Sequence, residues 1–187
     1  AVYWKDPVGK MANNSTCGAK AANTFVLYLP ADNSRESYGL VVYLHAGGFT
    51  SVDKNDDTKI LQWLCAKGYV AAGINYTLFT EENPTASVYS QSVEIRDSIP
   101  HVIAEAEKLG YVIDKMAIGG GSAGHTLAMI YAYRDAAQAP VPVVLTFGGV
   151  GPASFYQEDW GIFGLDQSDD SCAGLFSVMA GTAISPA

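Results

Sequence analysis

Charged residues are scarce in this chain of 187 amino acids. They make up 16% of it, and acidic side chains outnumber lysine and arginine by 19 to 11, which gives a formal net charge of −8. An acidic surface repels phosphate groups. We therefore expect neither a nucleic acid nor an anionic membrane surface as a partner.

Long apolar runs and cysteines are also few. The longest apolar runs, such as residues 39–44 and 140–147, are much shorter than the roughly 18 residues of a membrane-spanning helix, so we expect no membrane span. Cys17, Cys65 and Cys172 are too few and too scattered for a disulfide framework or a zinc site. We expect buried free thiols and no metal. The sequence does not decide between a secreted and a cytoplasmic protein.

What the sequence does contain is the pattern of an α/β fold. Short β-branched runs alternate with longer helical ones, which indicates a mainly parallel sheet covered by helices on both faces. With 49% hydrophobic residues, the chain can bury the core of one domain. We expect strands at residues 25–29, 40–44, 69–74, 115–118 and 143–147, and helices at residues 57–67, 99–109 and 123–133.

A G-x-S-x-G pattern, GGSAG, occupies residues 120–124 with Ser122 at its centre. It falls between an expected strand and an expected helix, where small residues permit the strained turn that raises a serine hydroxyl above a sheet. The N-terminus of the following helix favours a developing anion. We therefore interpret Ser122 as a nucleophile.

The same residues also match the dinucleotide fingerprint, with glycines at positions 119, 121 and 124. That interpretation requires an acidic residue about 20 positions further on, at the end of the next strand. Residues 143–149 contain no acidic residue. The fingerprint also normally lies in the first strand–helix–strand unit of a fold, whereas at least three expected strands precede this pattern. We therefore expect no nicotinamide and no other cofactor.

A second glycine pair, in HAGGF at residues 45–49, follows the strand expected at residues 40–44. The N–H groups of such a loop can approach a tetrahedral oxyanion without obstruction by a Cβ atom. Alone it would be an ordinary turn, but an elbow about 75 residues downstream makes it the complementary half of an acyl-transfer site. We expect an oxyanion hole formed by Gly47, Gly48 and Ala123.

These motifs resemble those of the α/β-hydrolase superfamily, and more closely its carboxylesterase branch related to hormone-sensitive lipase. Residues 45–49 resemble the H-G-G-G-F loop of that branch, INYTL at residues 74–78 resembles its strand ending in Y-R-L, and residues 118–124 resemble its elbow. The resemblance covers about residues 25–147. It implies that His45 supports the glycine loop.

The chain departs from the pattern of that branch at three positions. Ala46 replaces the first loop glycine, Gly121 stands where the branch has Asp or another small polar residue, and His125 replaces a further glycine. The first two changes are mild.

A serine nucleophile needs an imidazole to take its proton, and the chain has three histidines. His45 precedes the glycine loop, and His101 lies among the apolar residues of a flanking helix. His125 is one helical turn beyond Ser122 and would have to curl back over the turn to reach the hydroxyl. We expect none of the three to be the base.

In the family that the motifs resemble, the acid and the catalytic histidine follow strands beyond the one at residues 143–147. We expect neither strand here, and interpret residues 1–187 as a single α/β-hydrolase domain that is incomplete at its C-terminus. An irregular, aromatic-rich segment at residues 148–187 would lie over the site. A complementing C-terminal polypeptide would supply both residues, and without it we expect self-association.

The resemblance implies a serine carboxylesterase that hydrolyses small or medium carboxylic esters through an acyl-enzyme. Two alternatives remain open on the residues alone. One is a noncatalytic, hydrolase-like module that binds a ligand, and the other is a peptidase or acyltransferase of the same fold.

Overall fold

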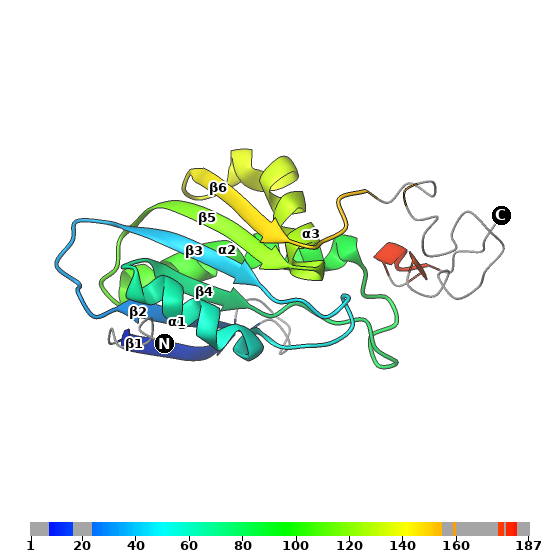
Figure 1. The fold of residues 1–187 in the computed structure, drawn as a ribbon, viewed down its shortest axis with the longest axis horizontal. Coiled ribbons are helices and arrows are strands. Elements are labelled where there is room, and N and C mark those ends of the chain that lie inside the picture. Colours follow the sequence, from blue (N-terminus) through cyan, green and yellow to red (C-terminus); the bar gives the residue numbers. More distant parts are fainter. Residues whose placement is uncertain (1–7, 17–23, 155–158, 160–175, 178, 183–187) are drawn as a thin grey trace.

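A six-stranded sheet forms the centre of the computed structural model, which describes residues 8–16, 24–154, 159, 176–177 and 179–182 (Figure 1). The strands are β1 (Val8–Thr16), β2 (Thr24–Pro30), β3 (Tyr38–Leu44), β4 (Val70–Ile74), β5 (Ile113–Gly121) and β6 (Val143–Gly149). Their order is β1-β2-β4-β3-β5-β6. Strands β4, β3, β5 and β6 are parallel, whereas β2 is antiparallel to both β1 and β4.

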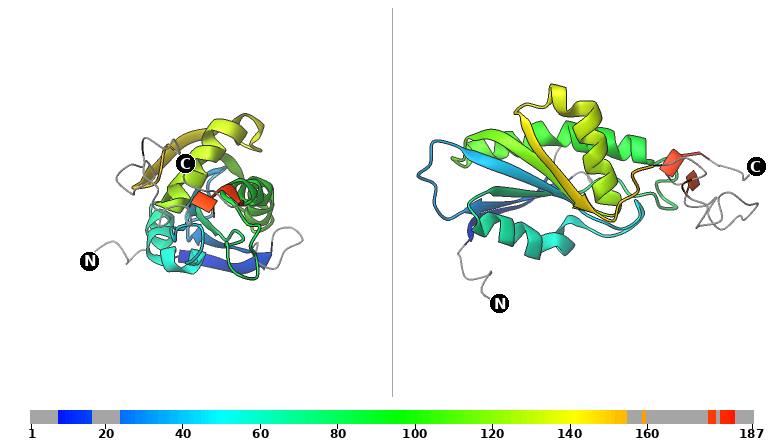
Figure 2. Two further views of the ribbon diagram at one scale, coloured as in Figure 1. Left: turned by 90° about the vertical axis from the view of Figure 1, so that its right-hand side faces the viewer. Right: turned by 45° about the horizontal axis from the view of Figure 1, so that its top comes forward.

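Helices cover both faces of this sheet (Figures 1 and 2). Helix α1 (Thr58–Ala66) follows a 3-10 turn, Lys54–Asp57, and packs on β2 and β4 from one side. Helices α2 (Val88–Lys108) and α3 (Ala123–Ile130) pack on the other side. A π-helical turn, Tyr131–Asp135, then continues α3.

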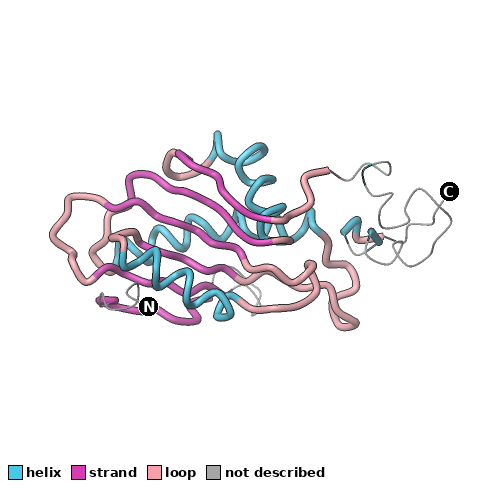
Figure 3. The backbone as a smooth tube through the Cα atoms, viewed as in Figure 1, coloured by secondary structure: helices cyan, strands magenta, loops and turns pink. Residues whose placement is uncertain are grey.

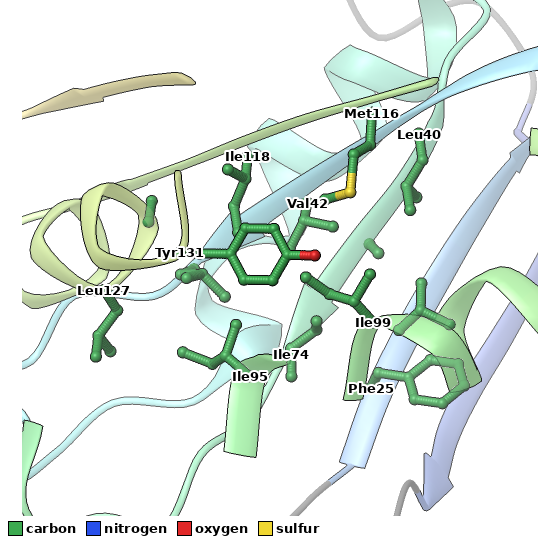
Figure 4. Close-up of a cluster of buried hydrophobic side chains, with 14 of the residues drawn as sticks. Phe25, Leu40, Val42, Ile74, Ile95, Ile99, Met116, Ile118, Leu127 and Tyr131 are labelled. Atoms are coloured by element: carbon green, nitrogen blue, oxygen red, sulfur yellow. The ribbon is translucent and has the colours of Figure 1, made fainter. Parts of the chain in front are cut away.

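Two apolar layers hold the helices against the sheet. The layer on the α2 and α3 side contains Val42, Ile95, Ile99, Ile118 and Leu127, all fully buried (Figure 4). Because alternate side chains of a strand face opposite sides, the intervening positions contribute to a smaller layer under α1, which includes Val26, Tyr28, Val41, Leu61, Leu64 and Cys65. Burial on both faces explains why the central strands are apolar throughout.

The predicted architecture is confirmed. All five predicted strands and all three predicted helices are present, and the strands at the centre of the sheet are parallel with helices on both faces. The helix predicted at residues 99–109 is the second half of α2, one element of 21 residues with Pro100 inside it.

One strand was missed and one boundary was wrong. The pattern did not predict β1, whose polar sequence VGKMANNST lacks apolar alternation and forms an edge strand. The segment predicted to be irregular from residue 148 onward begins inside β6, where Gly148 pairs with Gly120 and Gly149 with Gly121. Glycine has no side chain to reveal a strand, so the pattern ended too early.

Much of the aromatic-rich segment, together with Cys17 and Cys172, lies outside the described residues. Cys65 is a buried free thiol, as predicted, and its burial raises the pKa of the thiol to about 11. Among the helices that the structure describes, none is long and apolar enough to cross a membrane.

Strand β6 is the outermost strand of the described sheet, and its outer edge pairs with no described strand. Val144 and Leu145 on this strand are 62% and 56% exposed. Leu145 also lines an apolar groove of about 370 Å³ between β6 and Tyr69. An uncharged edge beside an apolar groove favours pairing with another chain.

We therefore expect the purified chain to self-associate through β6, and Leu145→Lys to weaken that association about tenfold or more, because it would bury an unpaired charge. Val112→Lys is the matched control, since it makes the same charge change at a side chain that is 53% exposed and outside β6. Size-exclusion chromatography with light scattering measures the effect. A wild-type chain that is monomeric at every concentration, or two variants that behave alike, would contradict this expectation.

Candidate active site

The loops that follow β3, β4, β5 and β6 all leave the sheet at the same edge (Figure 3). This is where ligand sites of open α/β sheets form. A pocket of about 560 Å³ lies there. It is lined by Gly48 and Phe49 after β3, Ser122 and Ala123 after β5, residues 150–154 after β6, and Asp159 and Met179.

Backbone strain is concentrated at this pocket. Among the described residues, the non-glycine residues with positive φ are Phe49, Val52, Ser122 and Val150, at φ values of 69°, 76°, 49° and 53°. Three of these four line the pocket. Such conformations cost about 1–3 kcal/mol each and persist only where the surrounding structure imposes them, typically at functional sites.

Ser122 forms the sharp turn between β5 and α3. Its φ of 49° and ψ of −118° lie outside both the helical and the strand regions. Its N–H donates to the carbonyl oxygen of Gly149 at 2.9 Å, and its own carbonyl oxygen accepts from the N–H of Thr126 at 3.2 Å. The turn is thereby tied both to β6 and to the first turn of α3.

Two glycines permit this turn because α3 starts almost against the end of β3. A Cβ atom at Gly124 would lie 2.0 Å from the carbonyl oxygen of Leu44, and one at Gly120 would lie 2.6 Å from the same oxygen. No side chain fits at such distances. The G-x-S-x-G pattern is therefore a packing requirement of the elbow.

The glycine loop after β3 turns back on itself beside the elbow. Gly47 and Gly48 have φ values of 107° and 59°. The carbonyl oxygen of Gly47 accepts from the N–H groups of Thr50 and Ser51 at 3.1 and 3.0 Å. Gly48 lines the pocket opposite Ala123 at the start of α3, whose first amides have no acceptor within the helix. Gly47, the residue before Gly48, accepts the hydrogen bonds that close the glycine loop.

His45 and Tyr76 support the start of this loop. The two rings stack at 4.2 Å, and the Tyr76 hydroxyl donates to the carbonyl oxygen of His45 at 2.9 Å. Burial lowers the pKa of His45 below its ordinary value, so the imidazole is neutral and its Nδ1–H donates to the carbonyl oxygen of Ala46 at 2.8 Å. The ring is 1% exposed and does not line the pocket.

Sequence reasoning missed Gln91, a fully buried residue of α2 that fixes the other end of the loop. Its Nε2 donates to the carbonyl oxygens of Phe49 and Thr77, both at 2.9 Å. The Phe49 carbonyl oxygen also accepts from the N–H of Phe79 at 3.1 Å. A polar residue on the apolar face of a helix was the signal in the sequence that could have identified Gln91.

The three histidines, all of them described, make no recorded hydrogen bond to the serine hydroxyl. His45 is held inside the loop, and His101 is exposed on α2. His125 is near Ser122, but its Nδ1 accepts the N–H of Gly151 at 3.2 Å. The structure records no hydrogen bond between Ser122 and any of these rings.

One carboxylate of the described residues reaches the pocket. Asp159 lines it and accepts a hydrogen bond from the hydroxyl of Ser154. Asp166, Asp169 and Asp170 lie outside the described residues. Within the described part of the chain, no three His, Cys, Asp or Glu side chains come together as they would around a metal ion.

We expect Gly124→Ala to lower the free energy of unfolding by about 1–3 kcal/mol, because its Cβ would overlap the backbone of Leu44 and force α3 outward. Gly149→Ala is the control: its Cβ would meet no atom within 4 Å, and its effect should stay under about 0.5 kcal/mol. Urea unfolding measures both. Equal effects of the two substitutions would refute the packing argument for the elbow.

A carboxyl group with a raised pKa lies at the end of the 3-10 turn before α1. Oδ2 of Asp57 is buried without a hydrogen-bond partner. Burial, assisted by the charge of Asp56, raises the pKa of Asp57 from 3.8 to about 6. The charged form is therefore disfavoured in the folded protein. Burial and the Asp57 charge together raise the pKa of Tyr76, which supports His45.

Because the pKa of Asp57 is higher in the folded state, the folded protein binds more protons between about pH 4 and 6, and its stability falls as pH rises through that window. Asp57→Asn should remove this loss. At pH 8 we expect the free energy of unfolding to rise by about 1 kcal/mol, a value limited by solvent screening at this partly buried site. Unfolding at pH 5 and pH 8 tests the effect, with the exposed Glu36→Gln as control; an unchanged pH dependence would contradict it.

Comparison with known proteins identifies the family and the fold. The BD-FAE family model matches residues 26–149 of the chain. No curated protein sequence matches it. Esterase B from Lactobacillus rhamnosis is similar in structure, with 21% identity and a TM-score of 0.66 over 98% of this chain and 66% of that one.

Two further solved structures share the fold. A bacterial heroin esterase matches at 21% identity and a TM-score of 0.62, over 76% of this chain and 44% of that one. A hyperthermophilic esterase from the archaeon Pyrobaculum calidifontis matches at 24% identity and a TM-score of 0.56, over 71% and 43%.

The chain spans between 60% and 66% of the length of the esterase B chains that it matches. These likenesses confirm the predicted α/β-hydrolase fold. Because the family model covers more than half of the sequence, the chain belongs to the BD-FAE family, a family of the α/β-hydrolase type.

Proposed function

We propose that the chain carries the nucleophile and the oxyanion hole of a serine carboxylesterase that acts on small or medium carboxylic esters. The observation that carries the proposal is the strained Ser122, which opens α3 in a pocket shared with Gly48 and Ala123. A serine fixed at such a turn serves nucleophilic attack, and amides beside it serve the oxyanion.

In this reaction the Ser122 hydroxyl attacks the ester carbonyl while a base takes its proton. The N–H groups of Gly47, Gly48 and Ala123 bind the oxyanion of the tetrahedral intermediate, which collapses to an acyl-enzyme as the alcohol leaves. Water then releases the acid by the same steps. His45 supports the loop without exchanging protons, since its Nδ1–H is held by Ala46.

Several of the similar proteins support the choice of ester chemistry. Esterase B has been captured with a tributyrin phosphonate, and esterase 2 from Thermogutta terrifontis has been phosphonylated by cyclosarin. The pocket wall at residues 150–154, with Asp159 and Met179, belongs to the segment at residues 148–187, which we propose covers the site.

The base and its acid partner come, in this proposal, from polypeptide outside these 187 residues. His45 and His125 are bonded to backbone groups of loops, His101 is exposed on α2, and the structure records no hydrogen bond from any of the three to Ser122. A second candidate function follows from the same observation. Without a base, the pocket would serve a hydrolase-like module that binds a ligand without turning it over.

Chemical rescue by imidazole separates the two candidates. We expect a fluorophosphonate probe to label the chain slowly, and free imidazole to raise the rate by about tenfold or more, because general-base catalysis contributes about 10²-fold or more when the base is fixed in place. Ser122→Ala should remove all labelling, whereas Ser34→Ala, at an exposed serine in the loop before β3, should remove none. Intact mass and its time course measure the labelling.

Each result decides between the accounts. Labelling that imidazole does not accelerate, at a rate equal to that of Ser122→Ala, supports the binding module and contradicts the esterase. Rapid labelling without imidazole means that a base within this chain reaches Ser122, which contradicts the external base.

A further inference from the structure

One contact between α3 and the loop after β6 has no part in the chemistry proposed above. The N–H of Gly151 donates to Nδ1 of His125 at 3.2 Å. His125 lies in α3 three residues after Ser122, and Gly151 lines the pocket beside Ser122. The imidazole therefore joins the helix of the serine to a wall of its pocket.

Two glycines leave room for this ring. A Cβ atom at Gly148 would lie 2.5 Å from Cδ2 of His125. One at Gly151 would lie 2.6 Å from Cβ of His125 and 2.6 Å from the carbonyl oxygen of Ser122. A side chain at either position would displace the ring or the wall. His125 and the two glycines are therefore complementary in shape across the gap between α3 and β6.

The wall that His125 contacts is strained. Val150, a β-branched residue, has a φ of 53° and is 94% exposed while it lines the pocket. A β-branched residue adopts such a backbone conformation only where its neighbours are fixed. Three hydrogen bonds from Ser122 and α3 fix the residues on either side of Val150. Besides the Gly151 bond, the N–H of Ser122 donates to Gly149 at 2.9 Å and Oγ1 of Thr126 donates to Pro152 at 2.7 Å.

We propose that His125 is a positioning residue that holds residues 149–152 as the wall of the pocket and thereby limits the size of the acyl group that Ser122 accepts. The inference rests on the proposed function for its substrate, but the contact itself does not. Without the Nδ1 acceptor, the Gly151 amide loses its partner and Val150 relaxes. The wall then yields to a longer chain, whereas Ser122 keeps the turn set by Gly120 and Gly124.

Two substitutions separate the hydrogen bond from the bulk of the ring. His125→Leu keeps a side chain of similar size and removes the acceptor. His125→Asn restores an acceptor, because Oδ1 of asparagine stands in the same place along the side chain as Nδ1 of histidine. If the leucine variant does not fold, His125→Ala removes the acceptor without new bulk.

Two measurements on the full chain follow the contact and its effect. The first is amide hydrogen exchange at Gly151 by NMR, which we expect to accelerate about fivefold in His125→Leu, in line with the loss of one hydrogen bond. The second is the ratio of the rates at which two phosphonate esters label Ser122 with imidazole present. The two esters carry an octyl or an ethyl chain on phosphorus, where the acyl chain of a substrate would be. We expect this ratio to rise about threefold or more in the same variant, since the fit of a few methylenes is worth that much. His125→Asn should return both towards the wild-type values.

An unchanged exchange rate at Gly151 would overturn the proposal, and so would faster exchange with an unchanged octyl-to-ethyl ratio. A rise in the octyl-to-ethyl ratio that His125→Asn does not reverse would assign the effect to the shape of the ring and also overturn the proposal. If Ser122 reacts with neither phosphonate in any variant, the proposed esterase function fails and the acyl-size limit fails with it. The exchange rate at Gly151 still decides in that case whether His125 holds the wall.

Discussion

The close approach of α3 to the end of β3 is the constraint on which the site depends. Gly124 and Gly120 both lie where a Cβ atom would strike the carbonyl oxygen of Leu44. Because neither has a side chain, α3 can start against β3 with a single residue, Ser122, between it and the end of β5. Ser122 must turn the chain in that single step, at a φ of 49°. The strain of the turn is offset by the packing of α3 on β5 and β6 and by the bonds of Ser122 to Gly149 and Thr126.

Side chain to backbone hydrogen bonds hold the loops on either side of the elbow. Behind the glycine loop, Tyr76, just after β4, and Gln91 of α2 each donate a hydrogen bond to its backbone. On the other side, His125 bonds the loop after β6. Buried polar side chains at the edge of the core therefore hold the pocket in place. Each of their hydrogen bonds fixes a backbone carbonyl or amide group in a loop that forms the pocket.

Sequence patterns predicted the parts of the fold that rest on burial. Strands β2 to β6 and all three helices reveal their burial as apolar runs or helical periodicity. The elbow is marked in the sequence by Gly120 and Gly124, positions where the packing admits no side chain. The polar β1 and the Gly148–Gly149 end of β6 carry no such pattern, because pairing alone forms them. A polar residue on the apolar face of a helix marks Gln91, but the pattern could not reveal the loops that Gln91 holds or the strained backbone of Val150, because both depend on which distant segments the sheet brings together. The serine and the glycine loop could be predicted as a pair; their catalytic roles stay predictions.

The central claim is that the raised serine faces amide donors from the glycine loop and from α3 in a common pocket. A crystal structure of the chain after reaction with a small phosphonate tests this claim most directly. The account predicts phosphorus bonded to Oγ of Ser122 and the phosphoryl oxygen about 2.7–3.1 Å from the amide nitrogens of Ala123 and of Gly47 or Gly48. A phosphoryl oxygen directed away from these amides, or phosphorus bonded to another residue, would contradict it.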